Sequence, residues 1–465
     1  MKKETLKKPR LMLAAAKSGS GKTMICCGLL QYLKRSGAAP AAFKCGPDYI
    51  DPMFHKKVLG IDSDNLDTFF SGRDEVREMV AAAEGGCVCI EGVMGLYDGA
   101  SPSRTEGSCY ELAEFTDTPI VLVVDARGAG RTLISVIKGI LSDDSNGLVK
   151  GIILNRMTGN FYERFRPCLE EELERSGFDA RVIGFLPVLK EAEFDSRHLG
   201  LKLPSETEDV LRRIDCVADA LAENCDMELL RDIMEGAAEL EAADRRVSRA
   251  LPLSEERPVL ALAYDEAFCF YYRENLRLLE QAGLRIERFS PLRDRALPEG
   301  TAGILLGGGY PELHGAELSA NTAIRNTILE AVECGMPVIA ECGGFMYLHE
   351  RLEDAEGKEY DMVGAVKGKC YPVGHPVRFG YFELEECRDP FWSGTEGVKG
   401  HEFHYYESES CGERCVAVKR ATGQRRSCMG GSGACFWGFP HFYYASKPVM
   451  AEKIAGAVKA FADRR

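Results

Sequence analysis

The chain has 465 residues, with 58 Lys and Arg against 72 Asp and Glu, which gives a formal net charge of −14 at pH 7. This length predicts two large domains or three smaller ones, and 45% hydrophobic with 28% charged residues excludes a wholly disordered or collagen-like chain. The acidic balance argues against nucleic acid and anionic membranes as partners, because their phosphates would be repelled.

The same composition favours a cytoplasmic protein. No run of about 18 apolar residues occurs, so we expect no transmembrane helix. The basic N-terminal segment does not have the pattern of a signal peptide. The 18 cysteines are scattered through a large chain, which predicts free thiols in a reducing compartment.

Residues 1–245 alternate short β-rich runs with amphipathic stretches, the pattern of βαβ units around a buried parallel sheet. The predicted strands are residues 11–15, 41–44, 87–91, 120–125, 149–155 and 181–185. The predicted helices are residues 22–36, 73–83, 106–115 and 131–141. After Pro204 the pattern is helical to about residue 240, and residues 241–256 are charged and poor in strand signals.

Residues 246–257 are interpreted as a linker, because proline and charge interrupt the periodicity there. A second α/β domain follows at 258–465. Its predicted strands are residues 259–263, 284–289, 303–307 and 337–340, and its predicted helices are residues 270–282 and 321–334. The last hundred residues predict β-hairpins, closed by a helix at 449–462.

The strongest local motif is KSGSGKT at residues 17–23, between a predicted strand and a predicted helix. This is the context of a phosphate loop, in which backbone N–H groups around Gly19 and Gly21 cradle phosphate oxygens. Lys22 would neutralise the β- and γ-phosphates, and the Thr23 hydroxyl would bind Mg²⁺. Lys17 is the other basic residue of the loop.

A triphosphate site also needs an acidic ligand for Mg²⁺. Glu91, at the end of a buried strand, is the first candidate, and Asp48 and Asp125 follow other strands. In a doubly wound sheet these strand ends converge at the edge where ligands bind. Asp48 and Asp98 are further candidates for substrate contacts. Asp125 is equally explained as a solvated turn at the strand end, and turn residues are the alternative for Asp51 and Asp98, beside Pro52 and Gly99.

Three more polar residues are weaker candidates for contacts with ATP or the substrate. Asn155 ends an apolar strand, where its amide would read adenine or would only cap a helix. Arg197 and His198 stand in a predicted loop and would contact an anionic substrate, although such a pair is more often plain surface.

In the second domain, residues 336–348 predict a strand, a sharp turn and a helix, with Cys342 at the turn. We expect the Cys342 thiol to be exposed at a helix N-terminus, which would lower its pKa and supply backbone donors for an oxyanion. Gly343, and Gly309 in the glycine run after another strand, would form that oxyanion hole. A buried core thiol is the alternative.

A thiol nucleophile needs a base, and the spacing leaves His441, His401 and His404 as alternatives. A zinc site is a weak further possibility on spacing grounds. Its ligands would be Cys411, Cys415, Cys428 and Cys435.

Over almost its full length, the chain resembles the cobyrinate a,c-diamide synthase family of cobalamin biosynthesis. The resemblance is carried by motifs in the family's order: the loop at 17–23, KCGPDYIDPMFH at 44–55, EGVMGLYDG at 91–99, VLVVDARGAGR at 121–131, RHLGL at 197–201, GGGYPELH at 307–314, ECGGFMYL at 341–348 and GHEFHY at 400–405. The family joins a dethiobiotin-synthetase-like, doubly wound P-loop domain to a class I glutamine amidotransferase domain of flavodoxin-like α/β fold.

The resemblance implies a glutamine-hydrolysing, ATP-dependent ligase that uses Mg²⁺. It selects His441 as the partner of Cys342. The usual class I pattern places an acid two residues beyond that histidine, where this chain has Tyr443, which implies a Cys–His dyad. The implied substrates are cobyrinate or a related tetrapyrrole, L-glutamine and ATP.

Other readings share these motifs. Nickel-sirohydrochlorin and hydrogenobyrinate a,c-diamide synthases would keep them all, so the sequence leaves the metal of the macrocycle open. A nucleotide-switched partitioning or scaffold ATPase would use the loop at 17–23 but leaves Cys342 unexplained. The oligomeric state is also open, a homodimer included.

Overall fold

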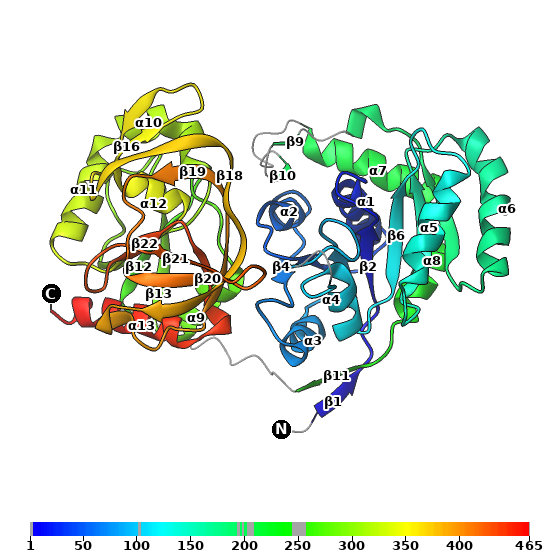
Figure 1. Cartoon of the computed structure of the whole chain (residues 1–465), viewed down its shortest axis with the longest axis horizontal. Coiled ribbons are helices and arrows are strands. Elements are labelled where there is room, and N and C mark those ends of the chain that lie inside the picture. Colours follow the sequence, from blue (N-terminus) through cyan, green and yellow to red (C-terminus); the bar gives the residue numbers. More distant parts are fainter. Residues whose placement is uncertain are drawn as a thin grey trace. The chain divides into compact units, whose positions relative to one another are not determined.

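The computed structural model in Figure 1 describes residues 3–100, 104–192, 196–197, 200–201, 209–243 and 257–464. The chain divides into two compact units, residues 1–247 and 248–465. The predicted linker at 246–257 lies outside the described residues, apart from Arg257. No helix in the described part of the chain combines the length and hydropathy that a membrane span requires.

The first unit alternates strands and helices as the sequence predicts. Its strands are β1 (Lys3–Leu6), β2 (Arg10–Ala15), β3 (Pro40–Cys45), β4 (Ser63–Leu66), β5 (Cys87–Glu91), β6 (Ile120–Asp125), β7 (Val149–Asn155), β8 (Arg181–Leu186), β9 (Ser196–Arg197), β10 (Gly200–Leu201) and β11 (Leu240–Ala243). Its α-helices are α1 (Lys22–Arg35), α2 (Ile50–Met53), α3 (Arg73–Ala82), α4 (Cys109–Phe115), α5 (Thr132–Ser142), α6 (Gly159–Arg175), α7 (Val210–Asn224) and α8 (Met227–Glu235).

A seven-stranded sheet in the order β4-β3-β5-β2-β6-β7-β8 forms the centre of this unit, and every pair in it is parallel. Helices α3 to α6 pack their apolar side chains against one face of the sheet. Helices α1, α7 and α8 pack on the other face, with α1 against α7. Strands β2 and β5 are buried at every position because both faces are covered. The predicted doubly wound fold is confirmed.

The sequence patterns missed several elements. Strand β11 pairs antiparallel with β1, so the expectation of a strand-poor segment from residue 241 is wrong at its start. The last helix of the first unit, α8, also ends at Glu235, before the predicted limit at residue 240. Helix α6 and strand β4 were not predicted: α6 carries an internal proline, and β4 reads SDNL, which lacks the β-branched pattern of a strand.

The second unit contains two sheets. Its strands are β12 (Val259–Ala263), β13 (Arg285–Phe289), β14 (Thr301–Leu306), β15 (Val338–Glu341), β16 (His349–Glu353), β17 (Glu359–Asp361), β18 (Val366–Cys387), β19 (Lys399–Ser408), β20 (Cys415–Lys419), β21 (Gln424–Cys428), β22 (Phe436–Gly438) and β23 (His441–Tyr443). Its α-helices are α9 (Arg273–Gln281), α10 (Gly315–Ala320), α11 (Thr322–Glu333), α12 (Gly343–Leu348) and α13 (Val449–Ala462).

A parallel sheet in the order β13-β12-β14-β15-β22 forms the α/β core of this unit. The hairpin-rich C-terminal part forms a mostly antiparallel sheet built on the long strand β18, as predicted. One continuous apolar cluster joins both sheets to helix α13. The carboxyl ends of β14, β15 and β22 lie side by side, which brings the loops after them together.

Candidate functional site

The predicted phosphate loop lies between β2 and α1. Gly21 precedes α1 with a φ of 91°, a left-handed conformation, and a Cβ there would lie 2.4 Å from Asn155 Nδ2. Lys22 is buried, and its Nζ donates to the Met94 carbonyl at 2.5 Å. Burial, and next the nearby Lys44 ammonium, lower the pKa of Lys22. This helix N-terminus with a buried ammonium has the character of a phosphate site.

A buried cluster of charged side chains lies behind the loop. Thr23 Oγ1 donates to Glu91 Oε1 at 2.6 Å and lies 3.3 Å from Asp51 Oδ2. Lys44 Nζ lies 2.5 Å from Asp51 Oδ2 and 2.9 Å from Glu91 Oε1. The other oxygen of Glu91, Oε2, lies 3.3 Å from His55 Nε2. Strands β3 and β5 are neighbours, which is why Lys44 and Glu91 meet.

The environment separates the two carboxyl groups of this cluster. Burial raises the pKa of Asp51, and the charges of Asp48 and Glu91 raise it further. Burial would also raise the pKa of Glu91, but Lys44 and then His55 outweigh it and hold that pKa below its usual range. The cluster therefore keeps Glu91 as a buried anion and favours a proton on Asp51.

The structure reassigns two acidic residues. The interpretation of Asp51 as a turn residue is wrong, because its side chain lies beside Thr23 and Lys44. Asp48 is the turn residue: its Oδ1 accepts from the backbone N–H of Ile50 at 2.8 Å and of Asp51 at 3.3 Å. An oxygen of Asp51, and not one of Asp48, is therefore the second carboxylate oxygen found beside Thr23.

The remaining candidate residues of this edge contact the protein itself. Asp98 Oδ2 accepts from the Gly95 N–H at 2.8 Å within its own loop. Asp125 Oδ2 pairs with Arg156 Nη1 at 2.8 Å. These contacts stabilise the loops that follow β5 and β6.

Asn155 supports the phosphate loop. Its Nδ2 donates to the Ser20 carbonyl at 2.8 Å, and its Oδ1 accepts from the Arg156 N–H at 3.0 Å. Contact with adenine would require the amide to leave these partners. Lys17 is exposed, and its carbonyl accepts from Ser20 Oγ at 2.9 Å.

The loop that contains Arg197 and His198 is described only in part. The Arg197 backbone belongs to β9, which pairs antiparallel with β10. The Arg197 side chain and the whole of His198 lie outside the described residues. Their predicted contact with an anionic substrate stays a prediction.

In the second unit, Cys342 stands at the sharp turn between β15 and α12. Its φ of 48° and ψ of −104° are strained for a residue with a side chain, and its N–H donates to the Gly438 carbonyl at 2.8 Å. The expectation of an exposed thiol with a low pKa is wrong. The side chain is buried, and burial, followed by the charges of Glu312 and Glu402, raises the pKa.

Two glycine backbones lie next to this turn. A Cβ on Gly343 would lie 3.0 Å from the Gly309 nitrogen, so the two predicted oxyanion donors belong to adjacent backbone segments. Gly309 has a φ of 156°, and a Cβ on it would lie 2.0 Å from the Ala267 carbonyl oxygen. Only glycine fits there, because any side chain would push this segment away from the turn.

Of the three candidate histidines, His441 is connected to the turn through Gly308. A Cβ on Gly308 would lie 2.4 Å from His441 Cε1, and the Gly308 carbonyl carbon is 3.4 Å from the Cβ that Gly343 lacks. His401 stacks on His441 with ring centroids 4.9 Å apart, and its Nδ1 contacts Tyr272. Burial lowers the pKa of His441 to about 3. At neutral pH His441 is therefore a neutral imidazole and Cys342 a protonated thiol.

The third candidate, His404, uses one ring nitrogen for a contact with a backbone carbonyl. Its Nδ1 lies 2.8 Å from the Tyr406 carbonyl, and its ring stacks on Phe439 with centroids 4.1 Å apart. The geometry thus favours His441, as the family resemblance does.

Both units of the chain match known protein families. Residues 11–201 match the CobQ/CobB/MinD/ParA nucleotide binding domain, and residues 259–439 match the CobB/CobQ-like glutamine amidotransferase domain. A curated cobyrinate a,c-diamide synthase from Caldanaerobacter subterraneus is 38% identical over 89% of this chain and 90% of its own length. The same enzyme from Listeria innocua is 34% identical over 97% of this chain and 99% of its own length.

This chain belongs to the cobyrinate a,c-diamide synthase family. It is a glutamine-dependent ligase with an ATP-binding domain. Among solved structures, PurLQS from Thermotoga maritima is matched over 44% of this chain at 17% identity, with a TM-score of 0.31.

Four buried residues of this synthase-family chain were not predicted as site residues: Lys44, Asp51, which was interpreted as a turn residue, His55 and Glu341. The first three lie in the motif at 44–55, with the lysine and the histidine at its two ends, and nothing local shows that all three side chains lie near β5. Glu341 directly precedes Cys342, so its closeness to the thiol is visible in the sequence, but its closeness to His441 is not.

The four cysteines of the alternative zinc site do not form one group, although Cys415 stands opposite Cys428 in the β20–β21 pair. Cys415 Sγ lies 2.9 Å from Cys387 Sγ, Cys411 Sγ lies 3.3 Å from Glu407 Oε1, and Cys435 donates to a backbone carbonyl. Within the described residues, a grouping compatible with metal binding is formed by Cys26, His55 and Glu91. This group adjoins the cluster behind the phosphate loop.

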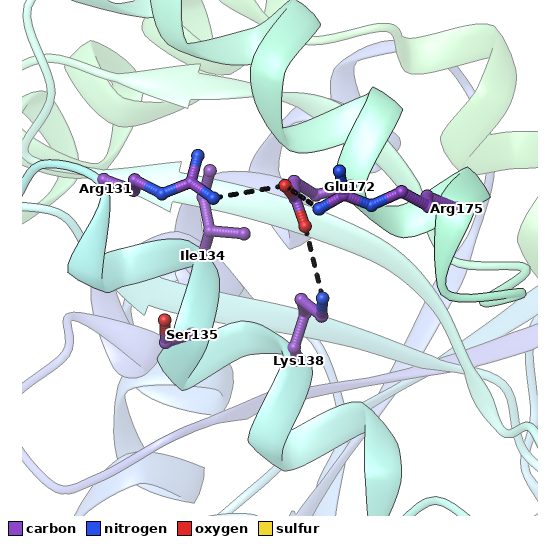
Figure 2. Close-up of a pocket in the computed structure, with 6 residues that line it drawn as sticks. All are labelled: Arg131, Ile134, Ser135, Lys138, Glu172 and Arg175. Carbon is purple, nitrogen blue, oxygen red and sulfur yellow. Dashed lines mark hydrogen bonds and ion pairs between the residues drawn. The ribbon is translucent and has the colours of Figure 1, made fainter.

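A cavity of about 340 Å³ lies between α5 and α6 (Figure 2). Glu172 stands in it and pairs with Arg131, Lys138 and Arg175, with the first two at 3.3 Å and 3.2 Å. These ion pairs join the two helices. None of the cavity's lining residues belongs to the phosphate loop or to the cluster behind it.

Proposed function

We propose that this chain is a cobyrinate a,c-diamide synthase, which amidates the a and c acetates of cobyrinate with glutamine or ammonia as nitrogen source and ATP as co-substrate. Residues 1–245 would bind ATP and the corrinoid, and residues 258–465 would release ammonia from glutamine. The observation that carries the proposal is that one chain holds a strained elbow cysteine, whose turn adjoins the Gly308 backbone on which His441 packs, and a phosphate loop backed by buried Glu91.

In the amidotransferase unit, the Cys342 thiol gives its proton to His441 and its sulfur attacks the glutamine carboxamide carbon. The C=O electron pair moves to the oxygen, which the N–H groups of Gly309 and Gly343 stabilise. The intermediate then collapses: the C–N bond breaks, and the nitrogen takes the proton from His441 to leave as ammonia. Water hydrolyses the remaining thioester to glutamate and restores the thiol.

In the first unit, an oxygen of the corrinoid carboxylate attacks the γ-phosphorus of ATP, and ADP leaves with the electrons of the broken P–O bond. Ammonia then attacks the acyl phosphate, and phosphate leaves as the amide forms. Activation is needed because a free carboxylate has too poor a leaving group to react with ammonia at neutral pH. The Lys22 ammonium stabilises the charge of the transferring phosphoryl group.

We propose Mg²⁺ as the metal cofactor. Thr23 Oγ1, Glu91 Oε1 and Asp51 Oδ2 form a group of oxygen donors beside Lys22, and hard oxygen donors suit Mg²⁺. Thr23 and Glu91 would hold the ion, directly or through its waters, with Asp51 in the place predicted for Asp48. When bound, Mg²⁺ supplies positive charge to the ATP phosphates.

A substitution at Glu91 tests this assignment. Glu91→Gln keeps the shape and removes the charge, so we expect a large fall in acyl-phosphate formation and a higher Mg²⁺ requirement, with normal glutamine hydrolysis. ATP cleavage is measured against Mg²⁺ concentration with corrinoid present. An unchanged rate and an unchanged Mg²⁺ dependence would refute the metal role of Glu91.

The substrate is tested directly. Purified protein is given ATP, Mg²⁺ and glutamine with cobyrinate, hydrogenobyrinate or nickel-sirohydrochlorin, and the products are weighed by mass spectrometry. We expect two successive losses of about one mass unit per carboxylate converted to amide, most rapidly with cobyrinate. Product from the metal-free or nickel macrocycle alone would assign the chain to that branch of the chemistry.

We further propose a cytoplasmic location, supported by 18 cysteines that are all free thiols in the structure. The net charge of −14 disfavours nucleic acid and anionic membranes as partners. We also propose a homodimer, which light scattering of the purified protein would test.

A further inference from the structure

In the amidotransferase unit, the residue two positions after His441 does not serve as an acid. Tyr443 stands there, and its ring packs edge-on against Tyr272 with centroids 5.3 Å apart. A buried acid reaches the same histidine from another strand. Glu341, the last residue of β15 and the neighbour of Cys342, places Oε2 3.8 Å from His441 Nδ1.

The Glu341 carboxyl group is held in place by its surroundings. Its side chain is 9% exposed, and Oε1 accepts from the Tyr444 hydroxyl at 3.1 Å. The Phe442 backbone N–H also donates to the carboxylate. Both partners follow His441 within three residues, so the segment that carries the histidine also fixes the orientation of the acid.

The imidazole ring is fixed as well. His401 stacks on one face of His441 with an interplanar angle of 8°. Gly308 lies against the Cε1–Nε2 edge of the ring, where a Cβ would be 2.4 Å from Cε1 and 3.2 Å from Nε2. With Nδ1 directed to Glu341, Nε2 is left on the side of Gly308, whose backbone adjoins the Cys342 turn.

We propose that Glu341 is the positioning acid of the glutaminase site, and that it replaces the acid missing after His441. The inference rests on the proposed glutamine hydrolysis. At 3.8 Å the Oε2–Nδ1 separation is longer than a hydrogen bond, and the proposed role requires it to shorten when substrate binds. Glu341 then accepts from Nδ1–H, which fixes the tautomer in which Nε2 accepts the Cys342 proton, and its negative charge stabilises the imidazolium that forms. Hydrogen bonds of this kind are often long before substrate binds and shorten in the complex.

Charge explains why this site needs such an acid. Burial lowers the pKa of His441 to about 3, so an unassisted imidazolium is unfavourable there. Burial raises the pKa of Glu341 to about 8, against hydrogen bonds from Tyr444 and Phe442 that lower it. The ionisable groups around Glu341 are Tyr271, Cys342, His441 and Tyr444.

Ionisation of Glu341 therefore falls within an accessible pH range. Below pH 8 the carboxyl is mostly protonated and stabilises the imidazolium less, and above pH 8 it is mostly the anion. Glutamine hydrolysis should accordingly rise with pH through a limb near pH 8 that belongs to Glu341.

The test uses the full chain and follows glutamate release from glutamine between pH 6 and 10. For Glu341→Gln we expect kcat to fall by about 100-fold with KM changed less than threefold, and the limb near pH 8 to disappear. Glu341→Asp should recover part of kcat and the limb. Synthesis from free ammonia should stay at the unmodified rate in both, and Glu333→Gln, on the exposed end of α11, is the matched control.

A second variant covers the case in which a substitution at the buried position prevents folding. Tyr444→Phe removes only the hydrogen bond to Oε1, so we expect a smaller fall in kcat and a limb moved to higher pH. Normal kcat and an unmoved limb in Tyr444→Phe, or in a folded Glu341→Gln, would overturn the inference. No glutamine hydrolysis by the unmodified protein would instead overturn the proposed function itself.

Discussion

The cluster behind the phosphate loop predicts a large stability effect from one lysine. Lys44 is 3% exposed and lies 2.5 Å from Asp51 Oδ2 and 2.9 Å from Glu91 Oε1. Lys44→Met keeps most of the side-chain volume but leaves a buried anion without its cation. Removing one partner of a buried pair costs about 3 to 5 kcal/mol. For a unit of this size that free energy corresponds to a Tm lower by roughly 6 to 20 °C.

The effect should also depend on pH. The low folded pKa of Glu91 contributes stability above its unfolded pKa, and that contribution is lost as pH falls through the folded value. In the variant the pKa of Glu91 rises, so the penalty is present at neutral pH and fades as the carboxylate is protonated. The difference in Tm between the variant and the unmodified protein should therefore shrink from pH 8 to pH 5.

Calorimetry of the full chain measures this, because each compact unit can give its own transition. Both tryptophans, Trp392 and Trp437, belong to the second unit, so their fluorescence reports that unit and should not change. Lys150→Met is the matched control, since Lys150 forms an exposed pair with Asp179 worth less than about 1 kcal/mol. If Lys44→Met lowered Tm no more than this control at any pH, the buried-cluster reasoning would be refuted.

Cys342→Ala should abolish glutamine-dependent synthesis and spare synthesis from ammonia, and loss of both rates in a folded variant would contradict the division of labour. Lys22→Ala should slow phosphoryl transfer by roughly 100-fold or more, so product formation should fail with either nitrogen source; near-normal synthesis from ammonia would make the loop structural. Burial raises the pKa of Glu402 from 4.5 to about 7, against Arg426 and Arg378. Because its folded pKa is raised, Glu402 contributes stability at low pH, and this contribution is lost as pH rises from about 4.5 to 7. The free energy of unfolding of the unmodified protein should therefore fall by an amount on the order of 2 kcal/mol between pH 5 and pH 8, and Glu402→Gln should lack this fall. Urea unfolding at the two pH values measures it. Parallel pH dependence in the variant and the unmodified protein would exclude this role.

Local patterns determined most of the secondary structure of this protein. Strands with continuous apolar runs, such as β5 and β6, and helices with a clear apolar stripe are visible because burial imposes a period on the sequence. The phosphate loop and the Cys342 elbow are also local, since each needs glycines and one reactive residue within a few positions. The short pair β1 and β11 was invisible because its two strands pair across more than 230 residues.

Only the tertiary structure decided which side chains meet. The parallel order of β3, β5 and β2 brings Lys44, Asp51 and Glu91 together behind Thr23, and no spacing in the chain encodes that contact. The same holds in the second unit, where Glu341 at the end of β15 reaches His441 on β23, a strand of the other sheet. Burial is likewise a tertiary property: it raises the pKa of Cys342, where the position at a helix N-terminus alone predicts the opposite shift.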